Sequence, residues 1–129
     1  MEYPNNLKYT EDHEWIRVED GVAYVGITDY AQDQLGELVY IEVETVGETL
    51  EKGEVFGTVE AVKTTSDLFM PVSGEVMEFN AAISEDDGDD PTLVNSDPYG
   101  DGWIVKIKLS EPDEVADLLT ADAYEAVVA

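Results

Sequence analysis

One lysine near the middle of the chain, Lys63, occupies a position where its amine is expected to be exposed and therefore available for chemistry. Lys63 follows an arm, residues 55–62, whose side chains alternate with the two-residue period of a strand, and it precedes a second such arm, residues 66–70. Pro71 ends the second arm. The two arms predict a β-hairpin with Lys63 at or near its tip, and a tip is among the most exposed places on a folded domain.

The surroundings of Lys63 favour its use as an attachment point over its use as a catalyst. A lysine that forms Schiff bases needs a desolvated or cation-flanked setting, whereas Thr64, Thr65 and Ser66 indicate a hydrated one. The lysine side chain together with an acyl chain supplies about ten single bonds of roughly 1.5 Å, enough to swing a group on the order of 10 Å. We therefore expect a tether.

Composition indicates a single domain that needs no covalent cross-links. The chain has 129 residues, enough to bury a core, and no cysteine, which excludes disulfides and thiolate metal sites. Residues 1–6 lack the features of a signal peptide, and no apolar run approaches the ~18 residues of a membrane span. We expect a soluble cytoplasmic protein.

The charge is strongly one-sided. Thirty-one acidic residues against six basic ones give a formal net charge of -25, which repels nucleic acid and anionic membranes, so we expect neither as a partner. The acidic groups also repel one another, and this repulsion destabilises the compact state unless salt screens it. We therefore expect a salt-rich cytoplasm and a halophilic prokaryotic source; the alternative is an ordinary acidic protein.

Short strands separated by glycine-rich turns, with helices confined to one end, predict a mainly β protein. Asp20 and Gly21 form a two-residue hairpin signal between strands at 15–18 and 22–27. Further strands are predicted at 38–44, at 76–79 and at 103–109, with residues 47–53 as a turn-rich connection. In the strand at 38–44, alternation places Val39, Ile41 and Val43 on one face and Leu38 and Tyr40 on the other. In the last strand, Trp103, Val105, Ile107 and Leu109 form the buried face, and Lys106 and Lys108 lie on the other.

The helix signals are local. Thr28 can cap a helix that runs to Leu35, with Gly36 ending it. Pro91 predicts one helical turn through 93–94. Ser110 with Pro112 predicts a helix that includes Val115, Leu118 and Leu119, and Thr120 caps a second one ending near Val128.

An acidic segment at 84–91 predicts a surface loop. It lacks the oxygen spacing and the closing bidentate glutamate of a calcium loop, so we expect no metal site.

Several motifs resemble one family. Glu60, Ala61, Val62 and Lys63, followed by Ser66 and Asp67 and then by residues 71–74, resemble the modification site of the lipoyl-bearing H protein of the glycine cleavage system. Segments 9–15, 25–28, 95–103 and 121–126 are also similar to family motifs. The departures are Ala61, where the family often has serine, and Thr64 and Thr65, where it often has alanine.

The resemblance implies a lipoyl/biotinyl-type barrel-sandwich hybrid, with two packed antiparallel sheets, short helices and a C-terminal helical segment. It implies one carrier domain over residues 1–129, with a lipoyl-type core at about 22–109 and C-terminal helices at about 111–128. Lipoate is then joined to Lys63 as an amide, and Glu60, Val62 and Thr64 flank it as recognition residues for a lipoate ligase or an octanoyl transferase.

The implied function is that of a monomeric, non-catalytic carrier. It receives the aminomethyl group of glycine from glycine decarboxylase, a pyridoxal-phosphate enzyme, and passes it to aminomethyltransferase. Dihydrolipoamide dehydrogenase then reoxidises the arm. Glu14 and Asp67 are candidates for contacting the loaded arm's basic amine, with solvated surface acids as the alternative. His13, the only histidine, is expected to be structural because no serine or cysteine partner is evident.

Other readings stay open at this point. A member of the same family can relay lipoate to other lipoyl-dependent complexes. A biotin carrier would have methionine on both sides of the lysine, where Val62 and Thr64 stand, and the lipoyl domains of 2-oxoacid dehydrogenases are shorter. An aldolase-like enzyme would form a Schiff base on unmodified Lys63, and a pure interaction module would carry no modification.

The charge generates a first testable expectation. Because molar salt shortens the Debye length to about 3 Å, the melting temperature should rise from dilute buffer to molar potassium chloride. Circular dichroism over a salt series measures this. Complete folding with an unchanged melting temperature in dilute buffer would contradict it.

Overall fold

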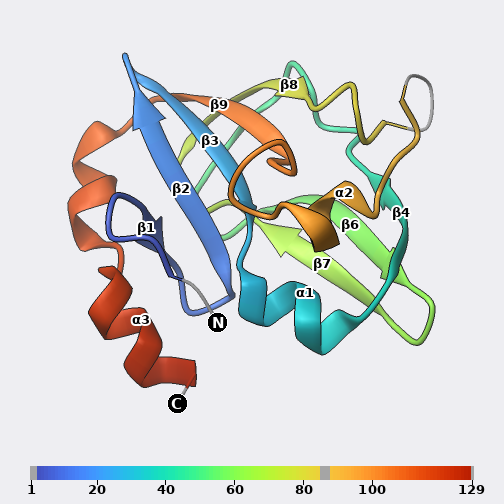
Figure 1. Ribbon diagram of the computed structural model, residues 1–129. Helices are drawn as coiled ribbons and strands as arrows, with labels where there is room; N and C mark the ends of the chain where they lie inside the picture. The colour runs from blue at the N-terminus through green and yellow to red at the C-terminus, as the bar shows by residue number, and fades with distance from the viewer. Residues whose placement is uncertain (1–2, 85–87, 129) are drawn as a thin grey trace.

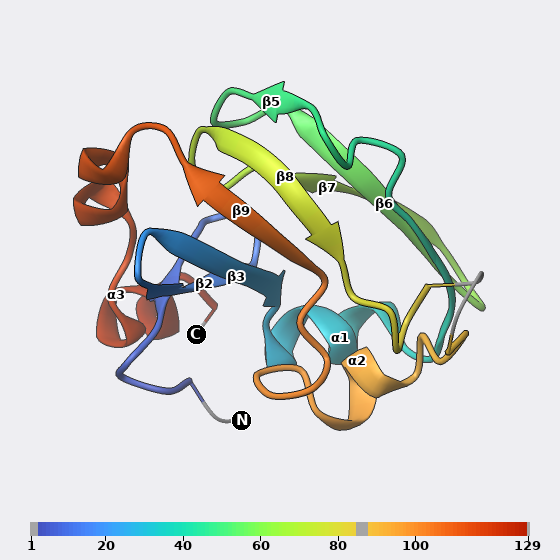
Figure 2. The same ribbon diagram turned by 90° about the horizontal axis from the view of Figure 1, so that it is seen from above.

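Two antiparallel sheets form the body of the protein in a computed structural model that describes residues 3–84 and 88–128 (Figures 1 and 2). A six-stranded sheet has the order β1-β2-β3-β9-β8-β5, and a three-stranded sheet has the order β4-β6-β7. The strands are β1 (Lys8–Tyr9), β2 (Glu14–Glu19), β3 (Val22–Ile27), β4 (Leu38–Glu42), β5 (Thr49–Leu50), β6 (Val55–Ala61), β7 (Thr65–Phe69), β8 (Gly74–Phe79) and β9 (Val105–Leu109). The helices are α1 (Asp29–Leu35), α2 (Leu93–Ser96), the 3-10 helix η1 (Pro112–Asp117) and α3 (Ala121–Val128). The predicted fold class is confirmed.

Local turn chemistry sets the first hairpin. Asp20 and Gly21 have φ of 53° and 80°, the left-handed values that a two-residue hairpin turn requires, and Glu19 pairs with Val22 across it. In the central hairpin, Glu60 pairs with Thr65, and the N–H of Ala61 donates to the carbonyl of Thr64 at 2.7 Å. Both predicted hairpins are confirmed.

Two register shifts correct the predicted strand faces. In β4 the pairing shifts between Leu38 and Tyr40, so that Leu38 and Ile41 are both buried while Val39 is 46% exposed. The prediction that Val39 and Ile41 share a face was therefore wrong, because an extra residue in one strand reverses the side-chain alternation beyond it. The pairing of β6 also shifts, between Val55 and Gly57, which breaks the alternation predicted for this arm.

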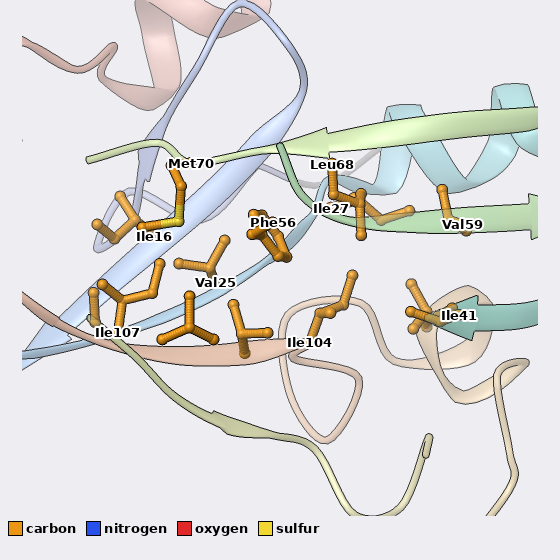
Figure 3. Close-up of a cluster of buried hydrophobic side chains, with 14 of the residues drawn as sticks. Ile16, Val25, Ile27, Ile41, Phe56, Val59, Leu68, Met70, Ile104 and Ile107 are labelled. Atoms are coloured by element: carbon orange, nitrogen blue, oxygen red, sulfur yellow. The ribbon is translucent and has the colours of Figure 1, made fainter. Parts of the chain in front are cut away.

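The main core lies between the two sheets. Figure 3 shows Phe56, Leu68 and Met70 of the smaller sheet and its continuation facing Val25 and Ile107 of the larger one. Full burial of such a side chain stabilises the fold by about 1.5–3 kcal/mol. In β9, Val105 and Ile107 are buried while Lys106 and Lys108 lie on the other face, as alternation predicts. The prediction that Trp103 shares the buried face was wrong: β9 begins only at Val105, Ile104 is buried, and the Trp103 ring packs against Tyr24 and Lys106.

An aromatic cluster attaches the C-terminal helix α3 to β1. The ring of Tyr124 stacks on that of Tyr9 with centroids 4.9 Å apart, and Thr120 caps the helix by accepting from the N–H of Ala123 at 3.2 Å, as predicted. The preceding helix was predicted through Leu119 but is a 3-10 helix that ends at Asp117. The reason is that Leu119 exchanges two backbone hydrogen bonds with Tyr9, which requires extended backbone.

The shorter helices begin where the sequence indicates. Thr28 caps α1 by accepting from the N–H of Ala31 at 3.1 Å, and Gly36 ends it with φ of 83°. The predicted turn after Pro91 is the helix α2, which begins at Leu93.

The connection at 47–53 contains the short strand β5, which the sequence did not predict. Part of the predicted loop at 84–91 lies outside the described residues. No described helix has the length and apolar character to cross a membrane.

Candidate functional site

Lys63 lies exposed in the turn between β6 and β7. The β6–β7 hairpin reaches the edge of the molecule (Figure 1). The N–H of Val62 donates to the carbonyl of Glu37 at 3.1 Å, which fixes the tip to the chain that leaves α1. The lysine side chain lies close to the end of α1, since a Cβ placed on Gly36 would be in ordinary van der Waals contact with Lys63 Cε, at 3.4 Å. Val62 is 73% exposed, and Glu60 and Thr64 are also exposed. The tip therefore presents an accessible amine together with the predicted flanking residues.

Asn95 holds the segment against which the tip is fixed. Its Nδ2 donates to Oε1 of Gln32 and to the carbonyl of Gly36, both at 2.9 Å, and its Oδ1 accepts from the N–H of Leu38 at 3.0 Å. One amide thus joins α2, the end of α1 and the start of β4. Sequence reasoning missed this role because a single asparagine in a short polar segment carries no signal of which distant backbone groups it will meet.

A cleft lies beside the hairpin, between β7, α1 and the loop before β2. Its volume is about 320 Å³. It is lined by Asp12, His13, Glu14, Ile27, Tyr30, Ala31, Gln34, Leu35, Val59, Ser66, Asp67 and Leu68. The structure therefore brings together Glu14, Asp67 and His13, which the sequence singled out. Asp67 is four residues beyond Lys63, about 13 Å at the rise of a strand, within the order of reach of an acylated lysine.

Glu14 is the buried acid of this cleft. It is 1% exposed, so the alternative of a solvated surface acid does not apply to it. The Thr10 hydroxyl donates to its Oε1 at 2.9 Å and the N–H of Phe69 to its Oε2 at 3.4 Å. Burial raises the pKa of Glu14 to about 8, with a smaller contribution from the charge of Asp12 and against the two hydrogen bonds, so this carboxyl is mostly protonated at pH 7.

Asp67 lies on the exposed rim of the same cleft, carried by β7. Its exposure leaves the solvated-acid alternative open for this residue. The two candidate acids thus differ in environment: Glu14 belongs to the larger sheet and is buried, whereas Asp67 belongs to the smaller sheet and is exposed.

His13 links the cleft to the C-terminal helix. Its Nδ1 lies 2.8 Å from Oη of Tyr124, which in turn lies 2.7 Å from Oγ1 of Thr28. Burial lowers the pKa of His13 despite the nearby charge of Asp12, which favours the neutral ring. This contact gives His13 a structural role between the loop before β2, α1 and α3.

Asn95→Asp should destabilise the protein by about 1–3 kcal/mol. The substitution keeps the acceptor for Leu38 but turns an oxygen toward the acceptors of Gln32 and Gly36, leaving them unpaired. Urea unfolding measures the loss, and amide hydrogen exchange at Val62 should accelerate. Ser96→Ala, at an exposed neighbouring position, is the control. Wild-type stability and exchange in Asn95→Asp would contradict this role.

The stability of the wild type relative to Glu14→Gln should depend on pH. Between the ordinary value of 4.5 and the folded value of about 8, the folded protein keeps a proton on Glu14 that the unfolded chain has lost. The wild type should therefore lose up to about 1.4 kcal/mol per pH unit over this range, with the loss levelling off above pH 8. Glutamine has no such proton. Urea unfolding of both proteins from pH 5 to pH 9 tests this, and a constant difference would contradict it.

Comparisons with known proteins agree with this geometry. A sequence model of the family described as "Glycine cleavage H-protein" matches residues 7–129. The chain is 59% identical over 128 residues to the glycine cleavage system H protein of Bacteroides thetaiotaomicron, covering 99% of this chain and 98% of that protein. It is 52% identical over 130 residues to that of Chlorobium limicola, covering 99% and 98%.

A solved structure is also similar. The crystal structure of a glycine cleavage system H protein from Mycobacterium marinum superposes with a TM-score of 0.85 at 42% identity, covering 96% of this chain and 97% of that one. The relatives come from varied bacteria and do not support the expected halophilic source. The match over nearly the whole chain shows that it belongs to the glycine cleavage H-protein family.

Proposed function

We propose that Lys63 carries lipoate through an amide bond and that this arm is the working part of the protein. Membership of the H-protein family makes the chain the lipoyl carrier of the glycine cleavage system. The observation that supports the assignment to Lys63 is its exposed position at a fixed hairpin tip, next to a cleft that holds a buried acid.

The tip suits recognition by a modifying enzyme. The hydrogen bond from Val62 to Glu37 and the pairing of Ala61 with Thr64 fix the backbone on both sides of Lys63. A lipoate ligase or an octanoyl transferase therefore meets the amine in a defined position, with Glu60, Val62 and Thr64 exposed as the residues it reads. Fixing the backbone lowers the entropy lost on docking, which favours this recognition.

The cleft fits the end of such an arm. Leu35, Val59 and Leu68 give it apolar walls, and Glu14 and Asp67 supply carboxyl oxygens. Lipoate supplies a redox-active sulfur pair on a flexible chain, which the cysteine-free polypeptide lacks. The cleft residues would shield the end of the arm from water, and Glu14 and Asp67 would accept hydrogen bonds from a cationic amine.

The whole chain acts as one non-catalytic carrier domain over residues 1–129, as a monomer in the cytoplasm. Its partners are glycine decarboxylase, aminomethyltransferase, dihydrolipoamide dehydrogenase and the enzyme that attaches lipoate. Each of these enzymes stabilises the transition state of its own reaction. The carrier therefore has only to present the arm and to protect it. The net charge of -25 makes nucleic acid and anionic membrane unsuitable partners.

Lys63→Arg should abolish glycine cleavage in a reconstituted system. Arginine keeps the positive charge and the approximate length but offers no amine for acylation. Release of carbon dioxide from glycine by the lipoylated wild type and by the variant measures the effect. Lys52→Arg, at another exposed lysine, is the matched control and should keep activity. Full activity of Lys63→Arg would refute the assignment, and a lipoylated wild type that cannot be loaded would favour the lipoate-relay alternative.

A further inference from the structure

A groove separate from the cleft lies between α1 and α2, which are side by side in both views of the molecule (Figures 1 and 2). Its volume is about 620 Å³, and it shares none of its described lining residues with the cleft. It is lined mainly by Gln32, Asp33, Glu37, Thr92, Asn95 and Ser96. The helix α1 therefore borders two hollows, and the function proposed for the cleft leaves this groove without a role.

The walls of the groove are fixed to each other. Asn95 of α2 donates to Oε1 of Gln32 and to the carbonyl of Gly36, both at 2.9 Å, and accepts from the N–H of Leu38 at 3.0 Å. These bonds join α2 to α1 and to the chain that leaves α1, so the groove is formed before a partner arrives. A preformed site loses little entropy on docking, which favours binding.

The groove is negatively charged. Asp33 and Glu37 are exposed and both line it, and none of its described lining residues is basic. It adjoins the C-terminal end of α1, where the helix dipole is negative and where the last turn has no basic residue of its own. The hydroxyl oxygens of Thr92 and Ser96 can accept further hydrogen bonds. The lining therefore suits a group with positive charge and several N–H donors, as in an arginine guanidinium.

A cation of this chain already lies at the edge of the groove. A Cβ placed on Gly36, which lines the groove, would lie 3.4 Å from Cε and 3.8 Å from Nζ of Lys63. The ammonium group of Lys63 thus lies at the negative end of α1, where the dipole stabilises it. On acylation, Nζ gives up two protons and forms an N–C bond to the lipoyl carbonyl carbon as the activating group on that carbon leaves. The product is a neutral amide, so lipoylation removes this positive charge from the groove.

We propose that the groove between α1 and α2 docks an arginine side chain of glycine decarboxylase, and that lipoylation of Lys63 favours this docking by removing a competing positive charge. The inference rests on the proposed function, in which the decarboxylase is the enzyme that takes up the unloaded lipoyl arm. The enzyme that attaches lipoate meets a carrier whose charged Lys63 still lies at the groove. The groove thus favours a partner that acts after acylation and lets it distinguish the lipoylated carrier from the unmodified one.

The double variant Asp33→Asn with Glu37→Gln, in lipoylated form, tests the docking. Both substitutions remove a charge and keep the size of the side chain. We expect the KM of glycine decarboxylase for the carrier to rise at least about tenfold, the change expected for a lost hydrogen bond to a charged group, with kcat kept because the arm is intact. Glu48→Gln with Glu111→Gln removes the same charge at exposed positions outside the groove and should leave the KM nearly unchanged. Circular dichroism and intact mass confirm that each variant is folded and lipoylated.

Unlipoylated protein tests the role of the Lys63 charge without activity as the readout. Isothermal titration of glycine decarboxylase gives the Kd of the unmodified wild type, of Lys63→Gln and of Lys63→Arg. Glutamine is neutral like the acylated lysine, so Lys63→Gln should bind about two- to fivefold more tightly than the wild type, the effect of one charge at a helix end. Lys63→Arg keeps the charge and should bind like the wild type.

The outcomes separate this inference from the proposed function. A wild type that is loaded normally beside a groove variant with unchanged KM would overturn the docking alone. Equal affinities of Lys63→Gln and the wild type would overturn its dependence on acylation. A rise in KM confined to aminomethyltransferase or dihydrolipoamide dehydrogenase would overturn the assignment to the decarboxylase. A lipoylated wild type that the decarboxylase cannot load would overturn the proposed function and this inference with it.

Discussion

The pairing of β6 with β7 is the constraint on which the site depends. It places Lys63 at a turn between two strands whose inner faces are buried in the main core, and the hydrogen bond from Val62 to Glu37 joins the tip to the chain that leaves α1. Burial of Phe56, Val59 and Leu68 against the larger sheet thus serves to hold an exposed amine in place (Figure 3). The same strand β7 carries Asp67 into the wall of the cleft.

Glu14, in the wall of the cleft, joins the two sheets. Glu14 begins β2 in the larger sheet, and the N–H of Phe69 at the end of β7 in the smaller sheet donates to it. Burying an ionised carboxyl without a cation is costly, and protonation removes most of that cost. The structure therefore joins the two sheets at an acid whose protonated form is favoured by its burial.

What the sequence predicted correctly was encoded locally. The turn at Asp20 and Gly21, the cap at Thr28 and the central hairpin follow from residue types within a few positions of one another. The register shift beside Leu38 could not be predicted, because the bulge arises where β4 meets β6, a partner distant in sequence. The early end of the 3-10 helix η1 likewise depends on Tyr9, more than a hundred residues away.

The sequence could suggest candidate site residues but not their environment. Lys63, Glu14 and Asp67 could be named as candidates from motifs, whereas the burial of Glu14 and the three hydrogen bonds of Asn95 require the packed structure. The most direct measurement of the central claim is the intact mass of the protein from its native source, with fragmentation of the peptide that contains residue 63. The account predicts a lipoyl group on Lys63 and none on the other lysines; native protein without that group, or with it on another lysine, would contradict it.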